Sequence, residues 1–541
     1  MVKLHKYLFH LIALFTITCN TETICQNNDN WISEFPGTSL INIFSFEAFP
    51  STFQDSIIFL HNSLPTNNNF IKINTATQTV ETNHIYGEYN GELISFLLTK
   101  EYKARKGIVG QFYTYGPKLD FIVLSDYPNE KHKGKAIVSN WEHSVYEPFT
   151  FEFLDDSTLL FSLIDYTPII DSIYKIGLKL TKWNYSKDSI EWTKNYLTAD
   201  NNTQEYHVSH LTKLSNGRCI MAGFFGSGTD FSGFLMEFSP ANGEIIRAVA
   251  FPQYDIDPFS KLIRISEDSE NNLFISSTHK DSQNNKSGII FKLSPEWNLL
   301  WAKKIIAKNY SPTRFATTTI DDGNILFVLY TDKELPVIIG HISSNGNLLW
   351  HNGLEFHSPY VILSEADGVY FISGKKYAPD GTSSPGIIVA KTTAEGELTN
   401  CPQLNACIQL EPFNIQLYPV QWLSVPSTIQ FVDMDTVILE FKSIFNASPY
   451  CSNLQPPNPF FSLPDTVCAG TCLQPDSTFN RLAHHVEWHI AGPMTDTLIA
   501  DTTFSFCFDQ PGTWTVTQRI WLLGCEDEWT HLLTVLPDDL H

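Results

Sequence analysis

The chain has 541 residues and a formal net charge of −23 at pH 7, with 17% charged, 13% aromatic and 43% hydrophobic residues. Nucleic-acid binding needs clustered lysine and arginine, so this charge argues against a nucleic-acid partner. The carboxylates are scattered, which fits a soluble exported chain better than a cation-binding one.

The first 25 residues have the layout of a secretory signal peptide. Charged residues up to Lys6 precede an apolar stretch from Tyr7 to about Thr18. We expect cleavage near Cys25, with lipid attachment at Cys19 or Cys25 as the alternative. No later segment approaches the ~20 apolar residues of a membrane-spanning helix. The sequence therefore predicts a secreted or outer cell-surface protein without a transmembrane segment.

The remaining chain is predicted to be all-β. It is rich in Phe (39), Tyr (21) and Trp (12), residues that suit pleated, half-buried surfaces. Its length after the signal is enough for two to four domains of about 100–200 residues.

A repeat of about 50 residues covers the first part of the chain. Each unit contains an Asn/Asp/Gly turn, a hydrophobic strand, a second strand and another polar turn, and the second turns fall near residues 240, 295, 344 and 394. About seven such units fit between residues 30 and 400. Three or four short strands per unit match a blade of a β-propeller, which we predict for 26–400; an open solenoid of hairpins is the structural alternative.

These units resemble the degenerate repeats of secreted bacterial propellers. The resemblance lies in Met221–Phe231 and in the following strand that ends at Glu244, while the Asn-Gly-Asn-Leu-Leu-Trp350 ending is similar to the pyrroloquinoline-quinone type of repeat. It concerns blade architecture rather than function. Quinoprotein dehydrogenases generally carry adjacent cysteines and a calcium site. Because this chain has no Cys-Cys pair, we expect no cofactor and no cofactor-binding residues.

The period breaks after residue 400. Residues 401–455 contain strand-like runs and three cysteines, and we predict a β-rich connector there. The prolines that follow Gln455 favour extended chain and mark a boundary. We place the last domain, a β-sandwich, at residues 456–541.

The last domain resembles the polycystic-kidney-disease (PKD) type of immunoglobulin-like sandwich. The resemblance is carried by Val467-Cys-Ala-Gly, by the strand around Trp488, and by Gln510-Pro-Gly-Thr-Trp-Thr-Val-Thr, although the family's Trp-Asp-Phe-Gly signature is reduced to Trp488-His-Ile. It implies a spacer or adhesive module of the kind found in bacterial type IX secretion and gliding-associated surface proteins. No sorting domain of that system follows His541, which leaves the export route open.

Seven of the ten cysteines crowd into the C-terminal third, at positions 401, 407, 451, 468, 472, 507 and 525. In an exported chain this density predicts disulfides, and the spacing of Cys468 and Cys472 does not match a zinc ribbon. Within the sandwich we favour Cys468 with Cys525 and Cys472 with Cys507, although four cysteines permit three connectivities.

His485, Glu487 and His489 alternate along one predicted strand, so their side chains share a face. That arrangement suits a zinc or copper site. Val486, Trp488 and Ile490 would then face the core, and alternation alone would put polar residues on the other side. We favour this second explanation and assign no metal-binding residue.

No nucleophile elbow, zinc-protease helix or phosphate loop is present, and we assign no catalytic residue. The sequence predicts a non-catalytic interaction or adhesion protein, with the propeller as binding platform, the PKD-like domain as spacer, and an unidentified protein or carbohydrate partner. The alternative is a secreted polysaccharide hydrolase or lyase acting from the propeller channel. Exposed aromatics and paired carboxylates in that channel would favour the enzyme.

Overall fold

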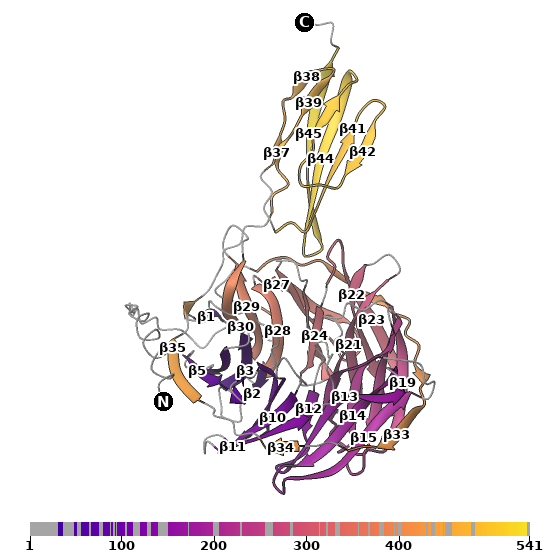
Figure 1. The fold of residues 1–541 in the computed structure, drawn as a ribbon. Helices are drawn as coiled ribbons and strands as arrows, with labels where there is room; N and C mark the ends of the chain where they lie inside the picture. Colours follow the sequence, from indigo (N-terminus) through magenta and orange to yellow (C-terminus); the bar gives the residue numbers. More distant parts are fainter. Residues whose placement is uncertain are drawn as a thin grey trace.

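The described chain is all-β, as predicted: the computed structural model has antiparallel sheets and no α-helix in the part that it describes (Figure 1). Between residues 31 and 149 it describes the backbone of the strands alone, and further on it describes 150–170, 173–198, 205–227, 230–254, 263–281, 285–312, 314–320, 323–330, 336–354, 356–365, 368–377, 383–393, 395–398, 403–428, 431–433, 439–446, 448–449, 457–477 and 482–537. The predicted signal peptide and Cys401 and Cys451 lie outside these ranges. In the described ranges, no helix has the length and apolar character needed to cross a membrane.

Seven sheets are built from four neighbouring antiparallel strands each. In chain order, six of them are β2 (Ala48–Pro50), β3 (Ser56–Ser63), β4 (Asn67–Asn74) and β5 (Thr79–Tyr86); β8 (Ser95–Tyr102), β9 (Arg105–Gln111), β10 (Leu119–Asp126) and β11 (Lys131–Val138); β12 (Thr150–Phe153), β13 (Thr158–Ile170), β14 (Ile173–Asn184) and β15 (Ser189–Thr198); β16 (Glu205–Lys213), β17 (Cys219–Ser227), β18 (Asp230–Phe238) and β19 (Ile245–Tyr254); β20 (Arg264–Glu267), β21 (Leu273–Lys280), β22 (Lys286–Leu293) and β23 (Leu299–Ala307); and β24 (Arg314–Thr319), β25 (Ile325–Tyr330), β26 (Val337–Ile342) and β27 (Leu348–Leu354). The seventh combines β28 (Phe356–Glu365), β29 (Gly368–Tyr377) and β30 (Ser383–Thr392) with the N-terminal β1 (Trp31–Phe35). A two-stranded hairpin, β6 (Glu88–Tyr89) with β7 (Glu92–Leu93), lies between the first two.

Contacts between successive sheets return to their starting point. They join β12 to β16, β16 to β20, β20 to β24, β24 to β28, β28 to β2, β3 to β8, and β8 to β12. We call these seven sheets the ring.

A recurring turn directly after the third strand of a sheet explains the period seen in the sequence. A hydroxyl begins each turn and a residue with positive φ ends it; the pairs are Ser239 with Gly243, Ser294 with Trp297, Ser343 with Gly346, and Thr393 with Gly396. In the last turn, Thr393 Oγ1 accepts hydrogen bonds from the amides of Glu395 and Glu397, both at 3.1 Å. Local side-chain hydrogen bonds of this kind depend on short-range sequence, which is why the repeat is readable.

The tryptophan near the start of a fourth strand fastens its sheet to the next turn. The indole Nε1 of Trp192 donates to Pro240 O at 3.1 Å, and that of Trp301 donates to Ser344 O at 3.0 Å. Trp350 instead lies against Gly396, where an added Cβ would come within 2.3 Å of its ring.

We predict that Gly396→Ala destabilises the protein by about 2–4 kcal/mol, because the new methyl group meets Trp350 and the residue keeps a φ of +75°. Gly217→Ala is the matched control, since Gly217 has a φ of +82° and nothing within 4 Å of its Cβ position. It should cost about 1 kcal/mol, the backbone strain alone. Urea unfolding of both variants measures the difference, and equal costs would contradict the role of the tryptophan contact.

Buried ion pairs also join neighbouring sheets. The side chain of Glu237 is fully buried and is paired with Arg218 at 3.1 Å and with Arg247, which also donates to Pro295 O in the next sheet at 2.6 Å. Asp268 pairs with Lys292 at 3.0 Å, and Lys292 reaches Ser344 O in the following sheet at 3.4 Å. Burial of these charges is tolerated because each has partners.

The pKa of Asp268 is lowered even though burial opposes ionisation, because hydrogen bonds from Asn272 and Lys292 outweigh the burial. A carboxylate whose folded pKa lies below its unfolded one stabilises the protein above the unfolded pKa, and this contribution disappears as the pH falls through the folded pKa.

We therefore expect Asp268→Asn to lower the free energy of unfolding by roughly 2–3 kcal/mol at neutral pH, since it leaves Lys292 buried without its partner. The difference from the wild type should shrink below about pH 4. Urea unfolding across this pH range measures it. The exposed Asp509→Asn serves as control, and a pH-independent difference for Asp268→Asn would disprove the electrostatic explanation.

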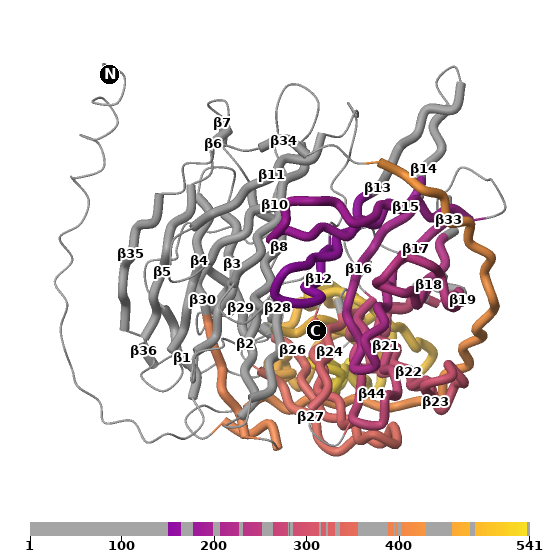
Figure 2. The backbone as a smooth tube through the Cα atoms, turned by 90° about the horizontal axis from the view of Figure 1, so that it is seen from below, coloured from indigo at the N-terminus to yellow at the C-terminus, as the bar shows by residue number. Residues whose placement is uncertain are grey.

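The segment predicted as a connector wraps around the ring. Its strands pair antiparallel with the outermost strand of six sheets, in reverse chain order: β31 (Ile408–Pro412) with β23, β32 (Tyr418–Pro419) with β19, β33 (Trp422–Pro426) with β15, β34 (Phe431–Asp433) with β11, β35 (Leu439–Asn446) with β5, and β36 (Ser448–Pro449) with β1. A bridge between Leu404 and Gly353 joins it to the remaining sheet. We call residues 404–449 the belt; Figure 2 shows its first part as an orange tube outside β15 and β23.

The belt has a repeat of its own. The residue after each of three prolines donates a backbone hydrogen bond to a fourth strand: Phe413 to Ala302, Val420 to Ala248 and Ser427 to Thr193, at 3.1, 3.4 and 3.0 Å. Consecutive donors lie seven residues apart, which is the length of chain that spans one sheet to the next. The strands β31, β32, β33 and β36 all end at a proline, and a proline offers no N–H to another chain at the exposed edge.

The C-terminal part forms a second group of sheets that stands on the ring (Figure 1). Its largest sheet has the order β38 (Thr466–Cys468), β45 (Cys525–Leu536), β44 (Gly512–Leu522), β41 (His485–Ala491), β42 (Asp496–Ile499), and it is antiparallel except between β38 and β45. Two short pairs complete it: β37 (Phe461–Ser462) with β40 (Asp476–Ser477), and β39 (Thr471–Leu473) with β43 (Phe506–Phe508). Trp488 and Trp514 are buried in its core. We call residues 457–537 the C-terminal unit.

Candidate functional site

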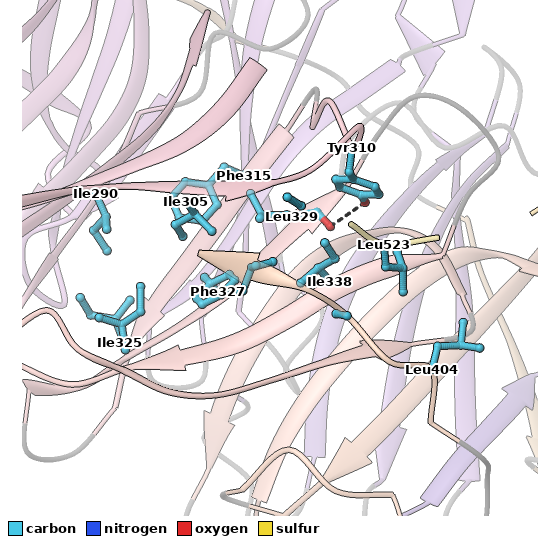
Figure 3. Close-up of a cluster of buried hydrophobic side chains, with 14 of the residues drawn as sticks. Ile290, Ile305, Tyr310, Phe315, Ile325, Phe327, Leu329, Ile338, Leu404 and Leu523 are labelled. Atoms are coloured by element: carbon cyan, nitrogen blue, oxygen red, sulfur yellow. Dashed lines mark hydrogen bonds between the residues drawn. The ribbon is translucent and has the colours of Figure 1, made fainter. Parts of the chain in front are cut away.

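The contact between the ring and the C-terminal unit combines a buried hairpin tip, a disulfide and polar contacts. The tip of the β44–β45 hairpin, Leu523-Gly524, enters the hydrophobic core of the ring, where Leu523 is fully buried. Figure 3 shows Leu523 beside Leu404, Ile338 and Tyr310. A hairpin tip is usually exposed, so the burial of Leu523 ties the C-terminal unit to the ring.

A disulfide and a backbone hydrogen bond connect this tip to the belt. Cys525 is bonded to Cys407 in the belt, and the Cys407 amide donates to Leu523 O at 2.9 Å. The predicted pairing of Cys525 with Cys468 is therefore wrong. The prediction treated the four cysteines of the last domain as a closed set, whereas the inserted hairpin brings Cys525 to the belt. The predicted pair Cys472–Cys507 is confirmed.

Polar contacts surround the inserted tip. Lys308 Nζ, from the ring, lies 2.5 Å from Glu526 Oε2 and 5.2 Å from the centre of the Trp521 ring. Tyr310 packs against His484 with ring centres 5.4 Å apart and donates to Leu329 O at 3.1 Å (Figure 3). Burial raises the pKa of Tyr310, so its hydroxyl stays protonated and acts as a donor.

We predict that Cys407→Ser separates the unfolding of the two parts. The lost cross-link closes a loop with a sequence separation of 118, which corresponds to about 4–5 kcal/mol in the chain-entropy model. Calorimetry should then show two transitions in place of one. Cys472→Ser is the matched control because its disulfide lies within the C-terminal unit, and it should lower stability while ring and unit still unfold together.

A single transition for Cys407→Ser, at the wild-type temperature, would show that the disulfide does not couple the two parts.

The alternating residues of β41 lie as predicted, with Val486, Trp488 and Ile490 buried and the polar residues on the other face. The two histidines point to different carboxylates: His485 Nε2 lies 2.7 Å from Glu487 Oε1, and His489 Nε2 lies 2.5 Å from Asp496 Oδ1. In the part of the chain that the structure describes, no three His, Cys, Asp or Glu side chains form a group that could hold a metal.

The innermost strands of the ring bear on the enzyme alternative. Among those with described side chains, β12, β16, β20 and β24, aromatic residues such as Phe151, Tyr206 and Phe315 are buried between sheets. Glu152 is half-buried on β12, and Glu267 on β20 accepts two hydrogen bonds from Ser215, at 2.7 and 3.0 Å.

The sequence contains one indication of the contact between the ring and the C-terminal unit, and the prediction did not use it. Leu522-Leu523-Gly524 places two apolar residues at a hairpin tip, where polar residues are normal. Leu523 has a φ of 50° and Gly524 of 82°, as a tight two-residue turn requires. Nothing in the sequence identifies Lys308 as a partner of Glu526, because that pairing depends on the placement of two distant segments.

No protein-family model matches the chain, and no curated protein matches it. Among solved structures, a luciferin-regenerating enzyme aligns with 55% of this chain and 91% of its own, at 8% identity and a TM-score of 0.27. A mannose phosphorylase from Leishmania mexicana aligns with 57% of this chain and 85% of its own, at 10% identity and a TM-score of 0.26. Similarities at this level support no conclusion about fold or function.

Proposed function

We propose that the protein is a non-catalytic binding protein of the cell exterior, in which a seven-bladed β-propeller is held in a fixed orientation by a PKD-like sandwich. In this proposal the seven sheets of the ring are the blades, and β1 completes the last one. The ring presents the binding surface, and the partner is a protein or a carbohydrate.

The observation that carries the proposal is the contact between the ring and the C-terminal unit. A flexible spacer would need few contacts with its neighbour, whereas here a buried hairpin tip, a disulfide and the Lys308–Glu526 ion pair connect the two parts. Interfaces between domains are mobile unless they are large and hydrophobic. The buried hairpin tip and the disulfide therefore favour a rigid attachment of the C-terminal unit over the spacer inferred from the sequence.

The two disulfides in the described part of the chain fit an oxidising compartment outside the cytosol, in agreement with the predicted signal peptide. Rigid presentation also suits binding, because a preorganised surface loses less conformational entropy when its partner docks.

A glycan array with the oxidised mature protein, followed by a reducing-sugar assay on every glycan that binds, tests the proposal. Binding without sugar release is the expected result for a carbohydrate partner. Sugar release would overturn the non-catalytic proposal in favour of a polysaccharide hydrolase. An unreactive array leaves protein partners, which cross-linking on the intact cell surface would identify; absence of the chain from the cell exterior would contradict the proposal.

A further inference from the structure

Two aromatic side chains lie half exposed on the C-terminal unit. Trp529 on β45 and Phe460, just before β37, are each 43% exposed, and their ring centres lie 5.1 Å apart at an interplanar angle of 58°. Large aromatic residues normally bury most of their surface. Each of these two residues keeps nearly half of its surface exposed, and the two side chains lie side by side.

The two aromatic residues lie at the edge of the largest sheet of the C-terminal unit, where its hydrophobic core ends. Trp529 faces the same side of β45 as the buried Leu533, but β38 pairs with β45 only at Thr534–Leu536. In the described residues, no strand pairs with this edge of β45 between Cys525 and Leu533. The Trp529 side chain therefore lies on the face of β45 that is buried at Leu533, but at a position beyond the residues that pair with β38.

The neighbouring chain holds Phe460 in place. Phe461 is fully buried and packs on Trp488 with ring centres 4.9 Å apart, and Pro459 fixes the backbone just before Phe460. The Phe460 amide donates to Asn458 Oδ1 at 2.9 Å. The backbone that carries the Phe460 side chain is therefore restrained before a ligand binds, which reduces the entropy lost on binding.

An exposed carboxylate lies further along the same edge. Asp465, whose side chain is 93% exposed, lies 3.6 Å from His531, which is two residues beyond Trp529 on the same side of β45. Aromatic faces and a hydrogen-bond acceptor along the same sheet edge suit a ligand that has both an apolar face and hydroxyl groups.

The size of the pair argues against a protein partner. Fully buried aromatic side chains remove about 150–250 Å² each from water, so two side chains that are 43% exposed leave roughly 130–215 Å². A stable protein interface needs about 800 Å² per partner. One sugar ring matches the smaller area.

We propose that Trp529 and Phe460 form a carbohydrate-binding platform on which the C–H face of a pyranose stacks while Asp465 accepts a hydrogen bond from a hydroxyl. This goes beyond the proposed function, which assigned binding to the ring and only support to the C-terminal unit.

Calorimetry of the oxidised full chain with cello-, chito-, xylo- and manno-oligosaccharides tests the platform. Trp529→Leu keeps apolar bulk but removes the flat ring, and it should weaken the binding of at least one oligosaccharide by about tenfold or more. Trp529→Phe should retain most of the affinity. Leu532→Ala is the matched control, because Leu532 is 63% exposed on the opposite face of β45 and should not matter.

Unchanged affinity in Trp529→Leu would overturn the platform and place sugar binding elsewhere, which leaves the proposed function intact. Equal losses in Trp529→Leu and Leu532→Ala, or no binding of any of these oligosaccharides by the wild type, would also overturn it. Thermal unfolding of each variant confirms that the fold is retained.

Discussion

Backbone hydrogen bonds between the belt and the outermost strand of each sheet are the interaction on which the rest of the architecture depends. Without them, seven sheets would each expose an open edge, which invites pairing with other chains. The belt covers six edges with a strand and touches the seventh through Leu404. Its prolines then leave an outer edge that offers fewer donors. Two segments that are far apart in the chain, β1 and the belt, thus complete the ring.

The belt also determines how the C-terminal unit is attached. Cys407 lies just before β31, so the disulfide to Cys525 fixes the C-terminal unit to a segment that is itself paired along the ring. Leu523 adds an apolar contact to the same place. A covalent bond, a buried side chain and an ion pair at one point restrain rotation as well as separation.

The sequence predicted what depends on local residues and missed what depends on distant partners. The turns at Ser239, Ser294, Ser343 and Thr393 recur because each is stabilised within a few residues, and they reveal the period. The alternation in β41 is local in the same way. The belt repeats every seven residues, but its register is set by Ala302, Ala248 and Thr193, which lie more than 100 residues away in the chain. Likewise, Cys525 could be paired correctly only by knowing that its hairpin enters the ring.

Hydrogen exchange across the belt tests the central claim most directly. The account predicts that the amides of Phe413, Val420 and Ser427 exchange as slowly as the fourth-strand amides beside them, because both are released only when the ring opens. Exchange of residues 408–427 on the timescale of an exposed loop, while the ring strands stay protected, would show that this segment is a connector and not a structural part of the ring.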